Sequence, residues 1–368
     1  MNRTECLMCY VLSGRWAVVL CLFVPRAVVP WIALGTIELG FGLGMWCPVQ
    51  AQIEISVPEP GGAGLPIALS PLANISGGVD QRLGLTFSDI IARDLDLSGV
   101  FHVIDRGAYL EGPRGLAPAE INFRQWSRLG ALALVKGGIS LDGDALTVEV
   151  RLFDVAQRRQ LGGKRYHGKR QDLRRMAHRF ADYLLLILTG EEGPFSSKIA
   201  FVSNRAGGRT KELYVTDLTG ADVQRITSAE TLILGPSWSP GATDLFYISY
   251  KRGGPFPYSF GLRSGKEQRL SRTVSYSGEW SPDGSRIVIS GEKVGNTDLF
   301  LLSAEGREMQ RLTRNASIDV SPSWSPDGRF LAYRLREEKG YGIYIKKVAG
   351  KHRSRRLTTG QHPSWSPY

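Results

Sequence analysis

The side chains that could do chemistry in this 368-residue chain are few, and their spacing suits none of the common sites. A serine hydrolase of the common type carries Gly-x-Ser-x-Gly, and the nearest segment, Gly138–Asp142, fails at its last position. The five histidines show no pair at metal-ligand spacing; they are His102, His167, His178, His352 and His362. We therefore expect no catalytic residue, no metal ion and no cofactor.

The cysteines are confined to the first 47 residues, at Cys6, Cys9, Cys21 and Cys47. Cys6 and Cys9 form a C-x-x-C, but neither a second cysteine pair nor a nearby histidine completes a zinc site. The rest of the chain has no cysteine, so its fold needs no disulfide.

Residues 1–51 are predicted to be a signal peptide or leader. Val49-Gln50-Ala51 has the small-x-small form of a signal-peptidase site, which predicts cleavage before Gln52 and export to the periplasm. Two alternatives stay open. The apolar stretch 27–46 approaches membrane-spanning length and could be an uncleaved anchor. A later start codon would instead place Arg26 at the head of a shorter leader.

The net charge of +11 favours anionic partners but does not choose among them. The basic stretch Arg158–Arg179 is interpreted as the solvated side of a hairpin and a helix. Nucleic acid is not expected as a partner, because Tyr166 is the one aromatic residue interleaved for base stacking and the leader exports the chain.

Residues 52–190 predict an α/β domain with a mixed sheet. Helical periodicity follows Leu83 and stops at Gly99, and a second apolar stripe runs from Leu173 to Gly190. Between these helices, apolar runs on both sides of Asp142-Gly143-Asp144 predict a hairpin. Residues 191–197 read as a linker to a second domain at 198–368.

The second domain is a set of repeats, each marked by a tryptophan before Ser-Pro. Neighbouring tryptophans are 42, 44 and 41 residues apart, at Trp238, Trp280, Trp324 and Trp365. Each unit ends on a segment such as Gln310-Arg-Leu-Thr313. A repeat of this length with four short strands is typical of a propeller blade.

A single blade has two apolar faces and cannot bury either alone, so blades stack around an axis. We expect each tryptophan to have this structural role, packed between neighbouring blades. The first unit begins at Lys198 without a preceding Trp-Ser-Pro, and a final Trp-Ser-Pro follows the fourth unit. A strand from that segment would complete the first blade and close a four-blade ring.

These residues together resemble the TolB family. The resemblance rests on Ser98–Asp105, Val148–Val155, Leu188–Gly190 running into Lys198–Ser203, and the closing Pro363-Ser-Trp-Ser-Pro-Tyr368. It implies an α/β N-terminal domain followed by an all-β propeller of four WD40-like, TolB-type blades. TolB propellers have six blades, so two repeats are absent here, and the result could be a small ring, an open arc or a damaged product.

The resemblance also implies a function and partners. The expected protein is a non-catalytic periplasmic scaffold of the Tol-Pal system that links inner-membrane Tol proteins to the Pal lipoprotein. It would support outer-membrane integrity and invagination during cell division. It is expected to be a monomer, peripheral to the envelope membranes. An alternative is a periplasmic propeller enzyme or carbohydrate-binding protein that uses the axial opening.

By the same resemblance, a TolA-like protein binds the extended segment at the mature N-terminus, and Pal binds the propeller face around the axis. The segment alternates apolar and polar residues, as a strand added to a partner's sheet does; it could also dock on its own domain. It consists of Gln52, Ile53, Glu54, Ile55, Ser56, Val57 and Pro58.

Overall fold

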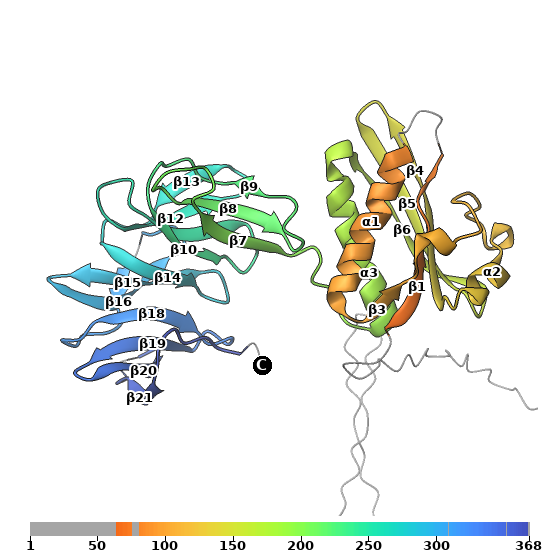
Figure 1. Ribbon diagram of the computed structural model, residues 1–368. Helices are drawn as coiled ribbons and strands as arrows, with labels where there is room; N and C mark the ends of the chain where they lie inside the picture. The colour runs from red at the N-terminus through yellow and green to blue at the C-terminus, as the bar shows by residue number, and fades with distance from the viewer. Residues whose placement is uncertain (1–63, 76–80, 308, 351, 367–368) are drawn as a thin grey trace, which may run out of the picture. The chain divides into compact units, whose positions relative to one another are not determined.

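The computed structural model describes residues 64–75, 81–307, 309–350 and 352–366 (Figure 1). The predicted leader at 1–51 and the segment Gln52–Pro58 lie outside the described residues. No helix among the residues described is long and apolar enough to cross a membrane.

Residues 64–190 form one mixed sheet with helices on it. The strand order is β3-β1-β4-β5-β6, and β2 adds to β4. Strands β3, β1 and β4 are parallel, whereas β4, β5 and β6 form an antiparallel meander. The bounds are β1 Leu65–Leu69, β2 Ala73–Asn74, α1 Gln81–Ser98, β3 Phe101–Val103, α2 Phe123–Arg128, β4 Ala133–Asp142, β5 Ala145–Asp154, β6 Arg159–Lys169 and α3 Leu173–Thr189.

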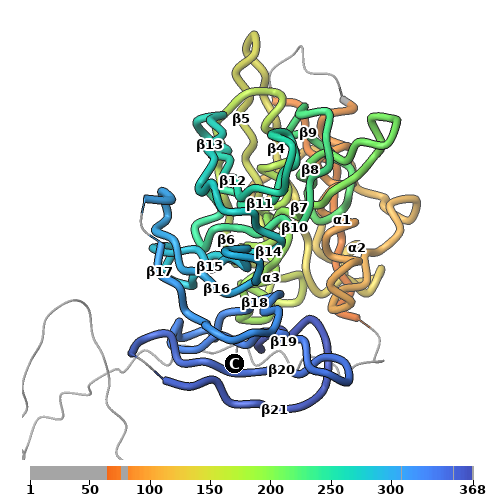
Figure 2. Tube along the Cα trace, turned by 90° about the vertical axis from the view of Figure 1, so that its left-hand side faces the viewer, coloured from red at the N-terminus to blue at the C-terminus, as the bar shows by residue number. Residues whose placement is uncertain are grey.

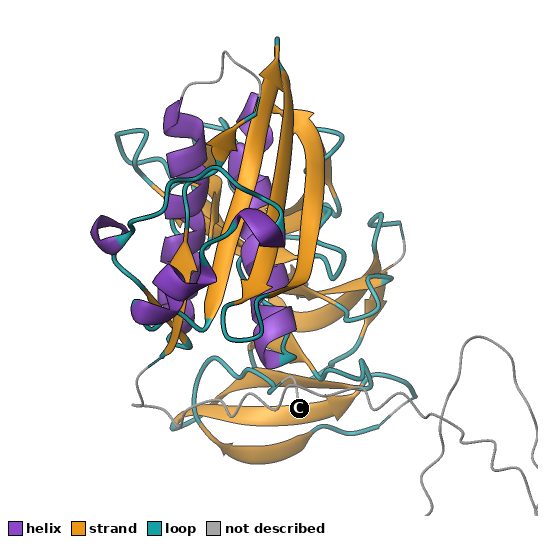
Figure 3. Cartoon of the chain, turned by 90° about the vertical axis from the view of Figure 1, so that its right-hand side faces the viewer, coloured by secondary structure: helices purple, strands orange, loops and turns teal. Residues whose placement is uncertain are grey.

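The two faces of this sheet are covered by different helices. Ile67 and Val135 point into a core shared with α1 and α3, whereas Ala68 and Leu134 point to the other side. There Trp126 of α2 packs against them. Side chains alternate between faces along a strand, so both faces of β1 and β4 are apolar. Figures 1 and 3 show α1 and α3 together on one side of the sheet.

Both long helices end where a glycine supports a left-handed backbone. Gly99 follows α1 with a φ of 66°, and Gly190 caps α3 with a φ of 81°.

The sequence analysis missed one strand. The basic stretch after residue 158 contains β6, which pairs along the whole of β5 at the edge of the sheet. The sequence of β6 shows no clear alternation of apolar and polar residues, because both faces of the strand carry polar residues and glycines.

One buried charge ties a long loop to the sheet. The ammonium group of Lys136 on β4 is fully buried and pairs with the carboxylate of Glu111. It also donates to the carbonyl oxygens of Gly112 and Arg114, at 3.2 and 2.8 Å. Glu111 in turn accepts from the indole nitrogen of Trp126 at 3.0 Å. The loop between β3 and α2 is therefore fixed by a satisfied polar network.

The described residues from 198 onward form four antiparallel sheets that follow one another in chain order (Figures 1 and 2). We number them one to four. The first contains β7 Lys198–Ser203, β8 Glu212–Asp217 and β9 Gln224–Arg225; the second β10 Ile233–Trp238, β11 Asp244–Ser249, β12 Phe256–Gly261 and β13 Lys266–Arg269; the third β14 Ser275–Trp280, β15 Arg286–Lys293, β16 Asn296–Ser303 and β17 Met309–Arg311; the fourth β18 Asp319–Trp324, β19 Phe330–Glu337, β20 Gly340–Lys347 and β21 Arg355–Thr359.

Each sheet buries its faces against its neighbours. Leu245 and Tyr247 of β11 pack toward the first sheet, and Phe246 between them packs toward the third. In the same way Ile287 of β15 faces the second sheet and Val288 faces the fourth. Successive side chains along a strand point to opposite faces, so they pack alternately against the preceding and the following sheet. Three apolar clusters join the four sheets in this way.

The sequence left open whether the four sheets close into a ring, and the described residues show no fourth strand in the first sheet. The first sheet has three strands, β7-β8-β9, and the described residues 360–366 form no strand beside β7. The indole nitrogen of Trp365 instead donates to the carbonyl oxygen of Ser323 in β18, at 3.1 Å.

We predict that Trp324→Ala lowers the free energy of unfolding by about 3 to 5 kcal/mol. The side chain is 5% exposed and fills the interface between the third and fourth sheets. Trp238→Ala is the matched control, because Trp238 is only partly buried and should cost less. Chemical denaturation of both variants measures this, and equal losses would contradict it.

We predict that Lys136→Met lowers the free energy of unfolding by about 3 to 5 kcal/mol, because it leaves the carboxylate of Glu111 without its buried cation. The double variant Lys136→Met with Glu111→Gln should recover part of the loss. A denaturant titration of the three proteins measures the coupling, and additive losses in the double variant would refute the buried pair.

Candidate partner-binding surface

Two of the repeated tryptophans form hydrogen bonds from one repeat to the preceding sheet. The indole nitrogen of Trp324 donates to the carbonyl oxygen of Glu279 at 3.3 Å, and Trp365 donates to Ser323 in the same way. Each acceptor is the residue just before the tryptophan of the preceding sheet. Trp280 is 8% exposed, and its indole nitrogen has no partner among the described atoms. The indoles therefore serve packing and register.

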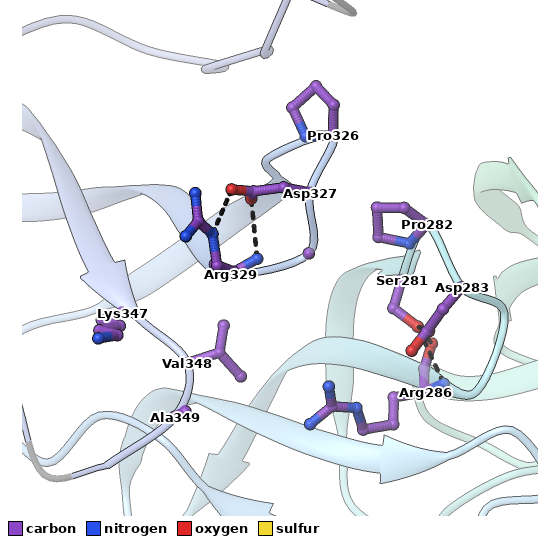
Figure 4. Close-up of a pocket in the computed structure, with 11 residues that line it drawn as sticks. Ser281, Pro282, Asp283, Arg286, Pro326, Asp327, Arg329, Lys347, Val348 and Ala349 are labelled. Carbon is purple, nitrogen blue, oxygen red and sulfur yellow. Dashed lines mark hydrogen bonds and ion pairs between the residues drawn. The ribbon is translucent and has the colours of Figure 1, made fainter. Parts of the chain in front are cut away.

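The Asp-Gly turns lie at one end of the third and fourth sheets, around a cleft of about 580 Å³ (Figure 4). Ser281 and the backbone N–H of Ser285 donate to Asp283, and they hold the pKa of that carboxyl at about 2. Ser325 and the N–H of Arg329 do the same for Asp327, whose pKa is also about 2. Both carboxylates therefore accept hydrogen bonds within their own turns and stabilise them.

The remaining charges around this cleft are positive. Arg286 lies with its guanidinium carbon 5.9 Å from the centre of the Trp324 ring, and Lys347 is exposed at the rim. Figure 4 shows Arg286 beside the turn that carries Pro282 and Asp283, and Lys347 on the other side, near Val348 and Ala349. The Ser281 hydroxyl also accepts from the N–H of Arg286 at 3.0 Å, so it stays engaged in the turn. The cleft is suited to hold an anionic group.

Buried acids mark the other end of the sheets, where β8 and β16 begin. Glu212 accepts from Thr227 at 2.5 Å and from the backbone N–H of Glu230 at 2.7 Å. In the third sheet Asp298 pairs with Arg311 and accepts from Thr313. These contacts repeat the same link between the third and fourth strands of a blade, so the acids have a structural role.

Asp319 differs from these acids. It is fully buried at the start of β18, where Asn315 donates to its Oδ2 at 2.8 Å. Its Oδ1 has no partner among the described atoms. Burial raises the pKa of Asp319 to about 6, and the nearby charge of Asp298 adds to this effect. Its side chain is therefore poised to gain a proton in mildly acidic solution.

Three exposed apolar side chains lie at this same end of the third and fourth sheets. Tyr276 begins β14, Val294 is in the β15–β16 turn, and Ile318 precedes β18. They are 43%, 95% and 38% exposed. Because these strands are antiparallel, the start of β14, the turn after β15 and the entry to β18 meet at one end. We call these three residues the Tyr276 surface.

Tyr276 is held in place although it is exposed. Its hydroxyl donates to the carboxylate of Glu292 at 2.7 Å, and that hydrogen bond raises the pKa of Tyr276 to about 12. Glu292 pairs with no described cation and lies at the end of the neighbouring strand. A preoriented, half-exposed aromatic ring is typical of the residues that dominate protein interfaces.

His178 on α3 belongs to a buried polar network rather than to a reactive site. Its Nδ1 lies 2.7 Å from Asp94 of α1, and its Nε2 lies 3.4 Å from Asp217 of β8. Burial alone would lower the pKa of His178, but the hydrogen bond and charge of Asp94, with the charge of Asp217, raise it. Arg174 also pairs with Asp217. Arg174 thus supplies a cation to Asp217, whereas burial raises the pKa of Asp94.

The described residues include no group of three or more His, Cys, Asp or Glu side chains that could hold a metal ion. The predicted binding segment Gln52–Pro58 lies outside the described residues. Sequence reasoning found the tryptophans and the Asp-Gly turns. It missed the Tyr276 surface, because Tyr276, Val294 and Ile318 belong to different segments of the chain and share no motif.

Comparison with known proteins matches two family models to this chain. The TolB amino-terminal domain matches residues 53–161, and the TolB beta propeller domain matches residues 186–368. A Tol-Pal system protein TolB of Syntrophotalea carbinolica is 44% identical over 199 residues, which are 54% of this chain and 45% of that protein. The TolB protein of Anaeromyxobacter dehalogenans strain 2CP-C is 33% identical over 299 residues, 80% of this chain and 67% of that protein.

The chain thus spans about half to two thirds of the length of the curated relatives it matches. Among solved structures, TolB from Acinetobacter baumannii aligns with a TM-score of 0.68 and 23% identity, over 84% of this chain and 75% of that one. That likeness shows the fold. Because the two family matches together cover most of the residues after position 52, the chain belongs to the TolB family.

Proposed function

We propose that this protein is a non-catalytic periplasmic scaffold of a Tol-Pal system. It would link inner-membrane Tol proteins to Pal and so support outer-membrane integrity and invagination during division. The observation that carries the proposal is the pair of family matches, to the TolB amino-terminal domain and to the TolB propeller. The relatives named Tol-Pal system protein TolB support the same role.

The chemistry of the described residues favours binding over bond-making. The perturbed carboxyl groups Asp283 and Asp327 are held by their own turns, and His178 is enclosed between two carboxylates. His178 lines a pocket, but its two ring nitrogens face the carboxylates of Asp94 and Asp217, which engages both atoms that a general base would use. Exposed apolar side chains at loop ends instead gain free energy when a partner covers them.

The Tyr276 surface is the proposed docking site for a Pal-type partner. It lies at one end of the third and fourth sheets and carries three exposed apolar side chains. Glu292 adds one carboxylate beside the ring of Tyr276, so the surface offers an apolar centre with an acidic neighbour. A partner with an apolar residue flanked by a basic one is complementary to it.

The segment Gln52–Pro58 is the proposed contact for a TolA-type partner. Ile53, Ile55 and Val57 alternate with polar residues, so one face of an extended strand is apolar. A strand of this kind binds by adding to the edge of a partner's sheet.

We predict that Tyr276→Ala weakens retention of Pal about tenfold or more, because it removes the exposed aromatic ring. Tyr276→Phe is the matched control. It keeps the ring, loses only the hydrogen bond to Glu292, and should retain most of the binding. Biolayer interferometry with immobilised Pal measures all three proteins. Equal affinities for the wild type and Tyr276→Ala would remove this surface from the proposal.

We predict that Ile53→Asp with Ile55→Asp abolishes retention of a TolA C-terminal domain and leaves Pal retention unchanged, because charges on the apolar face prevent strand addition. Glu54→Gln, on the polar face, should bind like the wild type. Pull-downs of the exported protein with both partners test this. A wild-type protein that retains neither partner would refute the scaffold role itself.

A further inference from the structure

A buried carboxyl group lies next to the Tyr276 surface, at a place where the fold does not need a charge. Asp319 is 0% exposed and stands five residues before Trp324. The strand registers place Ile233 and Ser275 at the same point of the second and third sheets. Both of these side chains are 0% exposed and neutral. A neutral side chain therefore satisfies the packing here, and the carboxyl group of Asp319 is a feature of the fourth sheet.

The segment 314–318 is attached to this carboxyl group through Asn315. The side-chain amide of Asn315 donates to Oδ2 of Asp319 at 2.8 Å. The backbone carbonyl oxygen of Asn315 accepts from the side chain of Asn296 on β16 at 2.7 Å. Ile318 ends the segment, and its exposed side chain belongs to the Tyr276 surface. The position of Ile318 therefore depends on the hydrogen bonds of Asp319.

A second carboxylate lies close to Asp319. Asp298 of β16 is 0% exposed, pairs with Arg311 of β17 and accepts from Thr313 at 3.3 Å. Burial raises the pKa of Asp319 to about 6, and the charge of Asp298 contributes. Burial and the charges of both carboxylates also raise the pKa of the Tyr333 phenol on β19. One guanidinium thus faces two buried carboxyl groups, and Oδ1 of Asp319 has no partner among the described atoms.

The charged groups on the other strands packed against β18 point elsewhere. By the strand register, Arg334 and Arg336 of β19 lie on the face of the fourth sheet opposite to that of Asp319. Glu279 of β14 contacts the far end of β18, and Glu292 of β15 accepts from a tyrosine hydroxyl on the surface. The charges that face Asp319 are therefore those of its carboxylate neighbour and of the guanidinium paired with it.

We propose that proton uptake by Asp319 fixes the segment 314–318 and so strengthens binding of a Pal-type partner at the Tyr276 surface. A proton on Oδ1 removes the like-charge repulsion between two buried carboxyl groups and gives the unpartnered oxygen a hydrogen to donate. A segment that is fixed before binding loses less conformational entropy when a partner covers Ile318. This inference rests on the proposed docking site and adds its regulation by pH.

Lower pH favours the protonated form with the fixed segment. The pKa of Asp319 is raised above the ordinary value for an aspartate, so the folded chain binds this proton more tightly than the unfolded chain does. The folded chain therefore gains stability as pH falls through about 6. Proton and partner affect each other equally, so binding of the partner should in turn raise the pKa of Asp319.

The first test is biolayer interferometry with immobilised Pal at about pH 7.5 and about pH 5.5, on the two sides of this titration. We expect the wild type to bind about fivefold more tightly at the lower pH. Asp319→Asn is neutral at both pH values and has the shape of the protonated acid, so it should bind at the low-pH level throughout. Asp283→Asn is the matched control. The pKa of Asp283 is about 2, so this variant should keep the pH dependence of the wild type.

The second test needs no partner. Hydrogen exchange of the exported protein alone gives protection factors for the amides of segment 314–318, and these factors exclude the intrinsic pH dependence of exchange. We expect the factors of the wild type to rise about fivefold from the higher to the lower pH. In Asp319→Asn they should be high at both.

Three results would overturn the proposal. Equal protection factors of the wild type at the two pH values would show that the proton does not fix the segment. Equal affinities of the wild type for Pal at the two pH values, or a pH dependence that persists in Asp319→Asn, would show that this carboxyl group does not regulate binding. A protein that binds Pal at neither pH contradicts the proposed docking function instead, and the protection factors still decide whether Asp319 fixes the segment.

Discussion

A four-stranded sheet with apolar residues on both faces is unstable alone, and the second half of this protein follows from that constraint. Each sheet is covered only by its neighbours, so burial passes from one interface to the next. Within one strand, Leu245 and Phe246 serve different interfaces. The indole hydrogen bonds add register to this packing, because each one reaches a backbone carbonyl of the preceding sheet. Stability in these sheets is therefore local to each pair of neighbours.

Polar groups in the interior follow a different rule: each is bound to the backbone or to an opposite charge. Lys136 is the clearest example, because its charge is fully buried and is balanced by Glu111 and two carbonyl oxygens. His178 between Asp94 and Asp217 is another. Some groups depart from this rule: Asp94 and Asp319 each have one oxygen without a partner among the described atoms, and burial raises the pKa of Asp319 to about 6. Such groups are costly to separate from their partners, so they specify how the elements fit together.

The residues best placed to bind a partner are those whose side chains are not buried in the packing of the sheets. The carboxylates at the Asp-Gly turns are hydrogen-bonded within those turns, and these bonds lower the pKa of Asp283. Tyr276 is left half exposed and held by Glu292. A propeller of this kind offers loops on a rigid support, which suits recognition of a protein partner.

Local patterns in the chain were enough to predict the elements whose signal spans a few residues. The stripe from Leu173 to Gly190 predicted α3, and the spacing of Trp280 and Trp324 predicted stacked blades, because periodicity and turn chemistry act over a few residues. The same patterns could not reveal β6, whose two faces lack apolar contrast, or the Tyr276 surface. The hydrogen bond from Trp365 to Ser323 of β18 became visible in the folded chain alone. It joins residues 42 positions apart, and a contact at that separation depends on packing that no local pattern encodes.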